Sequence, residues 1–427
     1  MPFKSPRGTR DLLPEQQPLW RHVEDVAKET ARRFGYQRID TPVFEQAGLF
    51  VRGVGQGTDI VEKEMYVFKD RGDEELSLRP EGTAPVCRAY LEHGMASLPQ
   101  PVRLYYLSPI FRYERPQAGR YRQHHQFGVE AIGDADAAVD AEIIELGWRF
   151  TETLGLTGLT LVINSIGDKA CRPAYLDALR EHYAARLSDV CPDCRMRYER
   201  NILRVLDCKR TDHKCQEAAE SAPRISERLC DACREHWRQL VSAIETLGIP
   251  YRVNHRLVRG LDYYTRTVFE IQPPDEGAQS TILAGGRYDG LIEELGGRAT
   301  PGIGFGTGIE RLVANLERQG VGARHASPSF PDALVAYMGA AAKEQALKLA
   351  SELRQQGLSV LLAPPGKSLK GQLRHADALH ARAVLILGED ELASGTVSVK
   401  DLGTGEQRRV GREEVTKHIE HATRALG

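Results

Sequence analysis

The stretch 102–133 constrains the fold of this chain most, because two apolar runs flank a segment rich in arginine. The runs, VRLYYLSPIF and QFGVEAIG, have strand character, and the gap between them favours an antiparallel pair joined by a long loop. Within it, residues 107–133 carry four arginines and two glutamates: Arg112, Arg115, Arg120, Arg122, Glu114 and Glu130. Arginine binds phosphate oxygens through two parallel hydrogen bonds and stays charged when partly buried. The pattern therefore predicts a site for a polyanion, beside a group that needs an acidic partner.

Composition excludes several classes of protein. The 427 residues are enough for two or three domains, and 41% hydrophobic with 27% charged residues is ordinary for a globular chain. A net charge of −2 gives no overall basic field, so any contact with nucleic acid must come from local patches. We find no signal peptide and no apolar run of the roughly 18 residues that a membrane helix needs. We expect a cytoplasmic protein without membrane contact, whose eight cysteines are too few for a disulfide scaffold.

The order of the expected elements changes near residue 320. Before it, strands and helices indicate a mostly antiparallel sheet flanked by helices, and the charged, helix-rich stretch 169–248 has the character of an insertion. A Gly/Ser/Pro segment follows at 320–332, and beyond it strands alternate with helices, as in a small α/β domain with a largely parallel sheet. The expected helices are 15–35, 136–154, 341–356, 368–380 and about 411–425. The other expected strands are YQRIDTPVFE (interrupted at Pro42), LTLVINSIG, ALVAYM, LSVLLA, AVLILG and TVSVKDL.

Four more fragments place polar residues next to apolar runs. They are LRPEGTAPVCRAY with Glu81 and Thr83 at a helix start, VRGLDYYTRTVFE with Arg259, Asp262, Tyr263 and Tyr264 on a turn, LAGGRYDGL with Arg287 and Tyr288, and GFGTGIERL with Arg311 on a helix. Glycines allow a ligand or another strand to approach the backbone closely. Taken singly, each arginine has the character of a surface residue and Glu130 that of a solvent-facing strand residue. Their repetition favours one shared site.

Two common nucleotide-binding motifs are not supported. Gly366-Lys367-Ser368 has Leu361 where a Walker A loop needs its first glycine. GIGFGTG has glycines but lacks the context of a dinucleotide-binding unit.

Together the fragments resemble the histidyl-tRNA synthetases, which are class II aminoacyl-tRNA synthetases. GYQRIDTPVFE is similar to motif 1 of class II, FRYERPQAGRYRQHHQFGVE to motif 2 and GIGFGTGIERL to motif 3. RGLDYYTRTVFE and AGGRYDGL resemble two signatures peculiar to the histidine enzymes, and PRGTRDLLP and LRPEGTAP fit as well. The resemblance runs from about residue 5 into the C-terminal domain.

This resemblance implies an α+β catalytic domain of residues 1–168 and 249–322, with a six- or seven-stranded antiparallel sheet. Residues 169–248 are then a helical insertion, and residues 330–427 an α/β domain that binds the anticodon. The resemblance also implies a homodimer with motif 1 at its interface, and L-histidine, ATP and tRNA(His) as ligands.

The implied reaction has two steps, formation of histidyl-adenylate and transfer of histidine to the tRNA 3′ end. The attacking histidine carboxylate is already an anion, so the first step needs positioning and charge neutralisation rather than a general base. By the family pattern, Arg112 and Arg259 act from opposite sides of the α-phosphate. The ATP site implied by the resemblance consists of Arg112, Glu114, Arg120, Arg122 and Arg311, with Mg²⁺ bridging the outer phosphates.

Neutral imidazole has one N–H donor and one acceptor nitrogen, so a selective pocket needs a partner for each. The resemblance assigns these roles to Glu130, which accepts, and Tyr264, which donates. It implies a histidine site made of Glu81, Thr83, Gln126, Glu130, Tyr263, Tyr264 and Tyr288, with the first three around the α-amino group.

Two CxxC pairs lie in the helical insertion. Such pairs suit tetrahedral zinc, and the candidate ligands are Cys191, Cys194, Cys230 and Cys233. The 35 residues between the pairs exceed the usual spacing of about 15–20. Cys208 and Cys215 are further candidates. A structural zinc site and reduced, metal-free cysteines both remain open.

Two other classes of protein share this fold but do not charge tRNA. One is the histidine-sensing regulatory subunit of ATP phosphoribosyltransferase, which generally lacks the anticodon domain and has degraded motifs. The other is a module that senses uncharged tRNA within a kinase. The presence of residues 330–427, the intact arginines and the lack of a kinase segment favour the charging enzyme.

Overall fold

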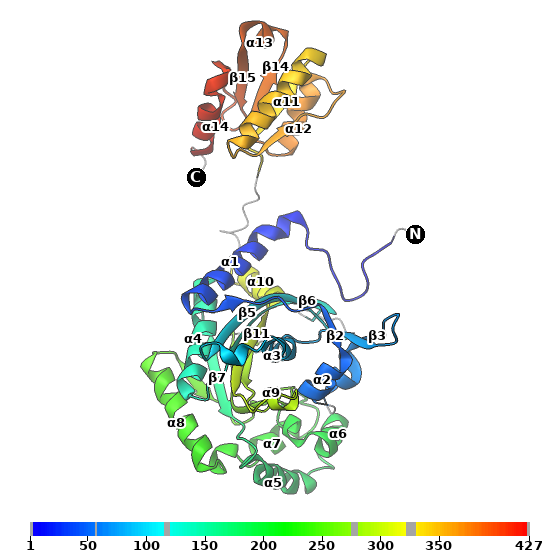
Figure 1. Ribbon diagram of the computed structural model, residues 1–427, viewed down its shortest axis with the longest axis vertical. Coiled ribbons are helices and arrows are strands. Elements are labelled where there is room, and N and C mark those ends of the chain that lie inside the picture. Colours follow the sequence, from blue (N-terminus) through cyan, green and yellow to red (C-terminus); the bar gives the residue numbers. More distant parts are fainter. Residues whose placement is uncertain (1–2, 56–57, 115–119, 275–280, 322–329, 425–427) are drawn as a thin grey trace. The chain divides into compact units, whose positions relative to one another are not determined.

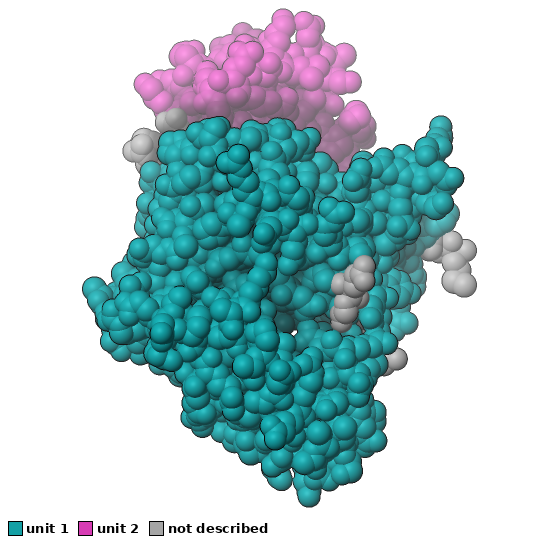
Figure 2. Space-filling view, turned by 60° about the horizontal axis from the view of Figure 1, so that its bottom comes forward, with its two compact units in different colours: residues 1–326 teal, residues 327–427 magenta. Residues whose placement is uncertain are grey.

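The computed structural model describes residues 3–55, 58–114, 120–274, 281–321 and 330–424, without the side chains of 420–424. The chain forms two compact units, residues 1–326 and 327–427, which Figure 2 colours separately. Part of the predicted arginine-rich loop, including Arg115, and most of the predicted Gly/Ser/Pro segment lie outside the described residues.

Among the described residues, the first unit is built on a sheet of eight strands (Figure 1). In spatial order they are β1 (Gln37–Arg38), β5 (Val102–Phe111), β6 (Gln123–Ile132), β11 (Gly302–Gly308), β10 (Leu283–Arg287), β9 (Thr265–Gln272), β7 (Thr160–Ser165) and β8 (Tyr251–Val253). The six central strands are antiparallel, as the sequence analysis expects. The edge strands β1 and β8 pair in parallel, and they are too short for a period of two to appear in the sequence.

The predicted hairpin is confirmed by β5 and β6, in which Val102 lies opposite Ile132. Side chains alternate between the two faces of a strand. Phe127 and Val129 of β6 join the core on one face, so Glu130 lies on the other. The lone glutamate in the apolar run is therefore a residue of the polar face.

Four helices cover the face that carries Phe127. They are α1 (Gln17–Arg33), α4 (Ala137–Thr153), α8 (Asp231–Thr246) and α10 (Ile309–Arg318). The helices expected at 15–35 and 136–154 are confirmed by α1 and α4. The spacing of Leu19, Val23 and Ala27 buries one side of α1, and Gly35 follows its end with a φ of 78°.

The other face shares a core with α3 (Thr83–Glu92), α9 (Leu291–Glu294), α5 (Arg172–Ala184), α6 (Pro192–Arg200) and α7 (Cys215–Glu220). A small sheet in the order β2 (Phe44–Gln46), β4 (Glu75–Leu78), β3 (Tyr66–Lys69) lies next to α2 (Ala47–Val54) in the chain. The elements β3, β4 and α2 were not predicted from the sequence, because each is short. The strand expected to break at Pro42 becomes two strands, β1 and β2, in different sheets.

The described part of the second unit has a five-stranded sheet with its own core. Its strands in spatial order are β13 (Val360–Leu362), β12 (Ala333–Tyr337), β14 (Ala383–Leu387), β15 (Thr396–Asp401) and β16 (Gln407–Gly411). Its helices are α11 (Ala340–Gln355), α12 (Leu369–Ala378), α13 (Glu389–Ser394) and α14 (Val415–Arg424).

The first three strands of this second sheet are parallel, and the last two pair antiparallel. The expectation of a largely parallel sheet is thus right for one half only. The missed strand β16 is an edge strand whose first three residues, Gln407, Arg408 and Arg409, are exposed, so it lacks an apolar pattern. In the described ranges, no helix has both the length and the apolar character required to span a bilayer.

Candidate functional site

A cavity of about 890 Å³ lies on the face of the large sheet that carries Glu130. It brings together most of the predicted site residues: Glu81, Thr83, Arg112, Glu114, Arg120, Gln126, Arg259, Tyr263, Tyr264, Tyr288 and Arg311. Of the described residues predicted for the site, Glu130 and Arg122 are not among those that line it. The residues come from 81–126 and 259–311, so the fold joins segments that are far apart in the sequence.

Glycines of β11 let side chains lie flat on this face. A Cβ atom on Gly304 would come within 2.0 Å of Glu130 Oε2, and one on Gly306 within 1.9 Å of Gln126 Nε2. Real Cβ contacts are never this short, and at Gly304 the Cβ would also lie 2.4 Å from the Val129 backbone oxygen, so only glycine fits there; at Gly306 a Cβ would displace the Gln126 side chain. The glycines of GIGFGTG thus make room for two predicted histidine-site residues.

Glu130 is buried just beneath the cavity, with both carboxyl oxygens hydrogen-bonded. Thr83 Oγ1 donates to Oε1 at 2.8 Å, and the Tyr288 hydroxyl donates to Oε2 at 2.7 Å. Burial raises the pKa of Glu130 to about 8, although the bonds from Tyr288 and Thr83 act in the opposite direction. Glu130 therefore holds a proton at neutral pH unless another donor or a positive charge comes close.

Glu81 organises the start of α3. Its carboxylate accepts hydrogen bonds from the backbone N–H groups of Thr83, at 2.7 Å, and Ala84, at 2.8 Å. Burial raises the pKa of Glu81, and these backbone bonds oppose the rise. Because Thr83 also donates its hydroxyl to Glu130, the two buried acids belong to one hydrogen-bonded network.

Three tyrosines form the wall above these acids. The ring centroid of Tyr263 lies 4.7 Å from that of Tyr264 and 5.9 Å from that of Tyr288. The Tyr264 ring packs against Gly286, where a Cβ would lie 2.8 Å from its Cδ1 atom. All three rings are buried, so they present a rigid surface to a ligand.

Tyr106 also belongs to this site, although the sequence analysis did not select it. Its hydroxyl accepts a hydrogen bond from Gln126 Nε2 at 3.3 Å, and its ring lies against Gly82 and Gly128. The strand alternation could have identified it, since Tyr106 lies opposite Gly128, two residues before Glu130.

The arginines of motif 2 are held by neighbouring groups. Arg112 directly follows β5, and its Nε donates to the Pro80 carbonyl oxygen at 2.7 Å. Arg120 lies 3.1 Å from the Glu114 carboxylate. The Arg122 guanidinium lies 3.8 Å from the centre of the Tyr113 ring, which accounts for its absence from the described cavity lining.

Arg259 and Arg311 approach the cavity from other elements. Arg259 Nη1 lies 2.5 Å from Oε1 of Glu270 on β9. The other oxygen of Glu270 accepts from Thr281 and Gln272. Arg311 on α10 donates from Nη1 to the Thr281 carbonyl oxygen at 3.0 Å.

Four arginines converge in the cavity, close enough for their charges to act on one another. Burial lowers the pKa of Arg311, and the charges of Arg120, Arg112 and Arg259 lower it further. Burial, together with Arg112 and Arg311, also lowers the pKa of His124 to about 3, so His124 remains neutral. Such a concentration of positive charge suits a polyanionic ligand.

The predicted grouping of both CxxC pairs around one ion is wrong. Within the described residues, Cys191 and Cys194 cluster with Cys208 and Cys215. The second pair belongs to a separate cluster that consists of Asp168, Cys171, Cys230 and Cys233. Spacing in the sequence identifies the pairs but does not show which of them meet in the fold.

Known proteins resemble this chain over almost its whole length. Residues 8–312 match the family model described as histidyl-tRNA synthetase, and residues 332–421 match the one described as anticodon binding domain. A histidine–tRNA ligase of Dehalococcoides mccartyi is 55% identical over 417 residues, which are 98% of this chain and 99% of that protein. One of Desulforamulus reducens is 49% identical, with the same coverage.

Solved structures give the same result. The apo histidyl-tRNA synthetase of S. aureus has a TM-score of 0.80 and 38% identity, and the match covers 98% of this chain and 99% of that one. The eight-stranded sheet with its helices and the separate smaller α/β unit thus form a class II fold. The chain belongs to the histidyl-tRNA synthetase family.

Proposed function

We propose that this chain attaches L-histidine to tRNA(His) in two steps. Histidine and ATP first give histidyl-adenylate and pyrophosphate, and the histidyl group then passes to the 3′ end of the tRNA. One observation carries this proposal: residues of both histidine signatures, Arg259, Tyr263, Tyr264 and Tyr288, line the same cavity as the motif 2 arginines. Membership of the histidyl-tRNA synthetase family supports it.

In the first step, the histidine carboxylate attacks the α-phosphorus of ATP, and the bond to pyrophosphate breaks. The nucleophile is already an anion, so no side chain has to remove a proton. Arg112 and Arg259 neutralise the negative charge that spreads over the phosphoryl oxygens. The Pro80 carbonyl and the Glu270 carboxylate hold the two guanidinium groups before the substrates arrive, which reduces the cost of orienting them.

We infer that Glu114, Arg120, Arg122 and Arg311 bind the rest of ATP. Arg120 and Arg122 flank the outer phosphates, while Glu114 and Arg311 contact the adenine. The positive charge that lowers the pKa of Arg311 supports this assignment. Arg122 has to leave the Tyr113 ring to reach a phosphate.

ATP carries Mg²⁺, and the carboxylates of the cavity fit an ion held mainly by phosphate oxygens. Three of these carboxylates already have protein donors: Glu114 has Arg120, Glu270 has Arg259, and Glu310 has His125. Mg²⁺ commonly keeps several waters and binds through substrate phosphates. When bound, the ion neutralises charge on the outer phosphates.

Glu130 and Tyr264 recognise the imidazole, and Glu81, Thr83 and Gln126 surround the α-amino group. The two buried acids, Glu130 and Glu81, provide acidic partners in a wall otherwise made of tyrosines. A site built to hydrogen-bond a substrate in this way rejects an isostere that lacks the groups by roughly 10⁴–10⁵-fold, because its own polar groups would stay unpaired.

We assign a separate role to each part of the two units. Residues 1–168 and 249–322 form the catalytic domain, 169–248 the helical insertion, and 330–427 the domain that binds the tRNA anticodon. The match of residues 332–421 to an anticodon-binding model supports the last assignment. We place the enzyme in the cytoplasm, where tRNA is charged for protein synthesis.

The enzyme is a homodimer in this proposal, with motif 1 at the interface. Support comes from exposed apolar side chains on the small sheet and just before it: Val43, Phe44, Val67 and Phe68. Phe44 and Phe68 lie side by side, with ring centroids 6.5 Å apart. An exposed apolar patch of this kind marks an interaction surface.

The first step is tested by ATP–pyrophosphate exchange with each of the twenty amino acids. The proposal predicts exchange that depends on histidine and Mg²⁺. Exchange with another amino acid alone would overturn the substrate, and no exchange at all would favour a histidine-sensing regulatory subunit. That alternative is not favoured, because the related charging enzymes match this chain over their whole length.

A further inference from the structure

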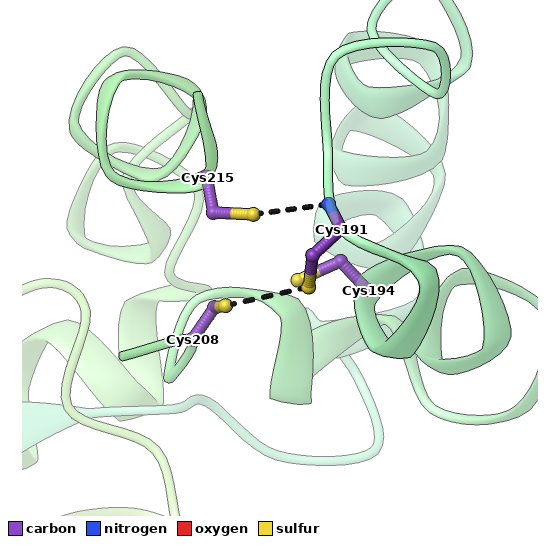
Figure 3. Close-up of side chains that lie close together, drawn as sticks. All are labelled: Cys191, Cys194, Cys208 and Cys215. Atoms are coloured by element: carbon purple, nitrogen blue, oxygen red, sulfur yellow. Dashed lines mark hydrogen bonds between the residues drawn. The ribbon is translucent and has the colours of Figure 1, made fainter. Parts of the chain in front are cut away.

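Four free thiols meet in the helical insertion, at Cys191, Cys194, Cys208 and Cys215 (Figure 3). Their sulfur atoms all lie within 4.8 Å of one another, and each residue is at most 4% exposed. The sulfurs of Cys191 and Cys208 are 3.8 Å apart, far beyond the roughly 2.05 Å of a disulfide. The cluster thus consists of four buried thiols that are close together but not bonded.

The spacing fits a tetrahedral metal site. With Zn–S bonds of about 2.3 Å, the sulfurs of a tetrahedron lie about 3.8 Å apart. Four sulfur ligands in this geometry are typical of zinc, whereas Mg²⁺ and Ca²⁺ prefer oxygen ligands. The cluster needs only small shifts to close around one ion.

Backbone N–H groups lie next to the four sulfur atoms. The backbone N–H of Cys191 donates to the Cys215 sulfur at 3.2 Å, a bond that Figure 3 marks. Cys191 directly precedes α6, and Cys194 lies in the first turn of this helix, where backbone N–H groups point outward.

The helices α6 and α7 contribute few large apolar side chains of their own to the core that they share with α5. Of the nine residues of α6, all within the described chain, Cys194 is the only buried one. The buried residues of α7 are Cys215, Ala218 and Ala219, which are small. The cysteines are therefore the buried groups through which a bound metal would cross-link α6 and α7.

We propose that Cys191, Cys194, Cys208 and Cys215 bind one structural Zn²⁺ as four thiolates. Each thiol releases its proton to solvent when the ion binds, and no oxidant is needed. The ion joins the start of α6, the turn at Cys208 and the start of α7. Residues next to these ligands, Asp207, Lys209 and Gln216, line the substrate cavity, so the ion also fixes one wall of that cavity.

The second cluster provides an internal control. Its carboxylate, Asp168, already accepts from the Ala170 backbone N–H at 3.0 Å, and Arg266 lies 3.4 Å away. Cys230 is partly exposed, and its sulfur lies 3.8 Å from Asp168 Oδ1. This cluster is therefore satisfied by protein hydrogen bonds.

Elemental analysis of the purified full chain tests the proposal, with Cys208→Ser as the variant and Cys230→Ser as the matched control. We expect about one zinc per chain in the wild type and in Cys230→Ser, and less than about 0.1 in Cys208→Ser. A wild type without zinc, or Cys208→Ser with an unchanged zinc content, would overturn it.

A second measurement requires no variant. Wild-type protein produced with Co²⁺ in place of zinc should show the intense visible d–d bands and the sulfur-to-cobalt charge-transfer bands of a tetrahedral thiolate site. A weak octahedral spectrum, or no bound cobalt, would contradict a four-sulfur site even if Cys208→Ser fails to fold.

Discussion

Arg287 at the end of β10 pairs with Asp140 on α4, and both side chains are completely buried. The Arg287 Nε lies 3.0 Å from Asp140 Oδ1, and His236 Nε2 lies 2.8 Å from the other oxygen. Burial opposes the ionisation of Asp140, but Arg287 and His236 hold its pKa below the usual range. This network fixes the end of β10 next to Tyr288, which donates to Glu130. Arg287 therefore acts as a positioning residue.

Arg287→Ala should lower the free energy of unfolding of the first unit by about 3–5 kcal/mol, because it leaves the Asp140 charge buried without its partner. Urea unfolding followed by tryptophan fluorescence measures this loss. The three tryptophans, Trp20, Trp148 and Trp237, all lie in the first unit.

Arg238→Ala is the matched control for Arg287→Ala, since it removes an ion pair with Glu235 that is exposed on α8. The control should unfold at the wild-type urea concentration. If Arg287→Ala also unfolds at the wild-type urea concentration, the buried Arg287–Asp140 pair does not stabilise the fold.

Arg259→Ala should slow adenylate formation by about 10²–10³-fold, because Arg259 stabilises charge that develops in the transition state. Histidine affinity should change far less. Single-turnover kinetics gives the rate, and calorimetry gives the affinity. Arg252→Ala, which removes another cavity arginine that bonds to Gln272, serves as the control. Equal losses of rate and affinity would mean that Arg259 only holds the ground state.

Histidine should bind more weakly as the pH falls from 8 to 5.5. Free imidazole gains a proton below a pKa of about 6.5, and the nearby arginines disfavour a charged imidazole. Burial raises the pKa of Glu130 to about 8, so Glu130 must also lose its proton if it accepts the imidazole N–H. Protonation of the imidazole and protonation of Glu130 both weaken histidine binding as the pH falls. Calorimetry across this range measures the affinity, and an affinity that rises as the pH falls would show that imidazolium is the ligand.

Glu130→Gln should weaken histidine binding by about 1.5–3 kcal/mol, since the amide keeps the shape and an acceptor but loses the charge-assisted bond.

The raised pKa of Glu130 also affects the stability of the fold. A buried acid with a raised pKa stabilises the fold below its unfolded pKa, and this contribution is lost as the pH rises from about 4.5 to 8. Glu130→Gln should therefore remove this part of the pH dependence of unfolding, and an unchanged profile would refute the assignment.

Phe44→Asp should convert a dimer into a monomer. An unpaired carboxylate in an apolar contact costs roughly 3 kcal/mol or more, which raises the dissociation constant about 10²-fold. Light scattering during size-exclusion chromatography measures the mass. Leu98→Asp, at another exposed apolar residue, is the control and should stay dimeric. A Phe44→Asp protein that remains a dimer would place the interface elsewhere.

A chain that ends at Ala326 should keep histidine-dependent pyrophosphate exchange and lose tRNA charging. The buried core of the second unit lies within 333–419, so the cut removes no core residue of the first. Charging efficiency should fall at least about tenfold, the effect of losing roughly 1.4 kcal/mol of binding. Unchanged charging by the shortened chain would refute the anticodon assignment.

The sequence predicts the parts of the fold whose patterns are long and regular. The strands β5 and β6 have ten residues each, and α1 has a clear apolar stripe, so all three are where we expected them. Short elements such as β3, β4 and β16 contain too few residues for a period to appear. Their positions depend on tertiary pairing, which local preference does not encode.

The candidate site follows the same rule. The sequence motifs identify the residues of the site, but they do not show which residues form hydrogen bonds or ion pairs with one another. The Glu130–Tyr288 bond joins β6 to the loop after β10, and the Arg287–Asp140 pair joins β10 to α4. The two CxxC pairs separate because one lies on α6 and the other on α8. Such contacts depend on topology rather than on spacing in the chain.

Charging of tRNA(His) by the full chain tests the central claim most directly. The assay follows the transfer of radiolabelled histidine to purified tRNA(His) in the presence of ATP and Mg²⁺, with a different tRNA as the control. The account predicts histidine on tRNA(His) and none on the control tRNA. Histidine-dependent pyrophosphate exchange without any charged tRNA(His), or the charging of tRNA with another amino acid, would contradict it.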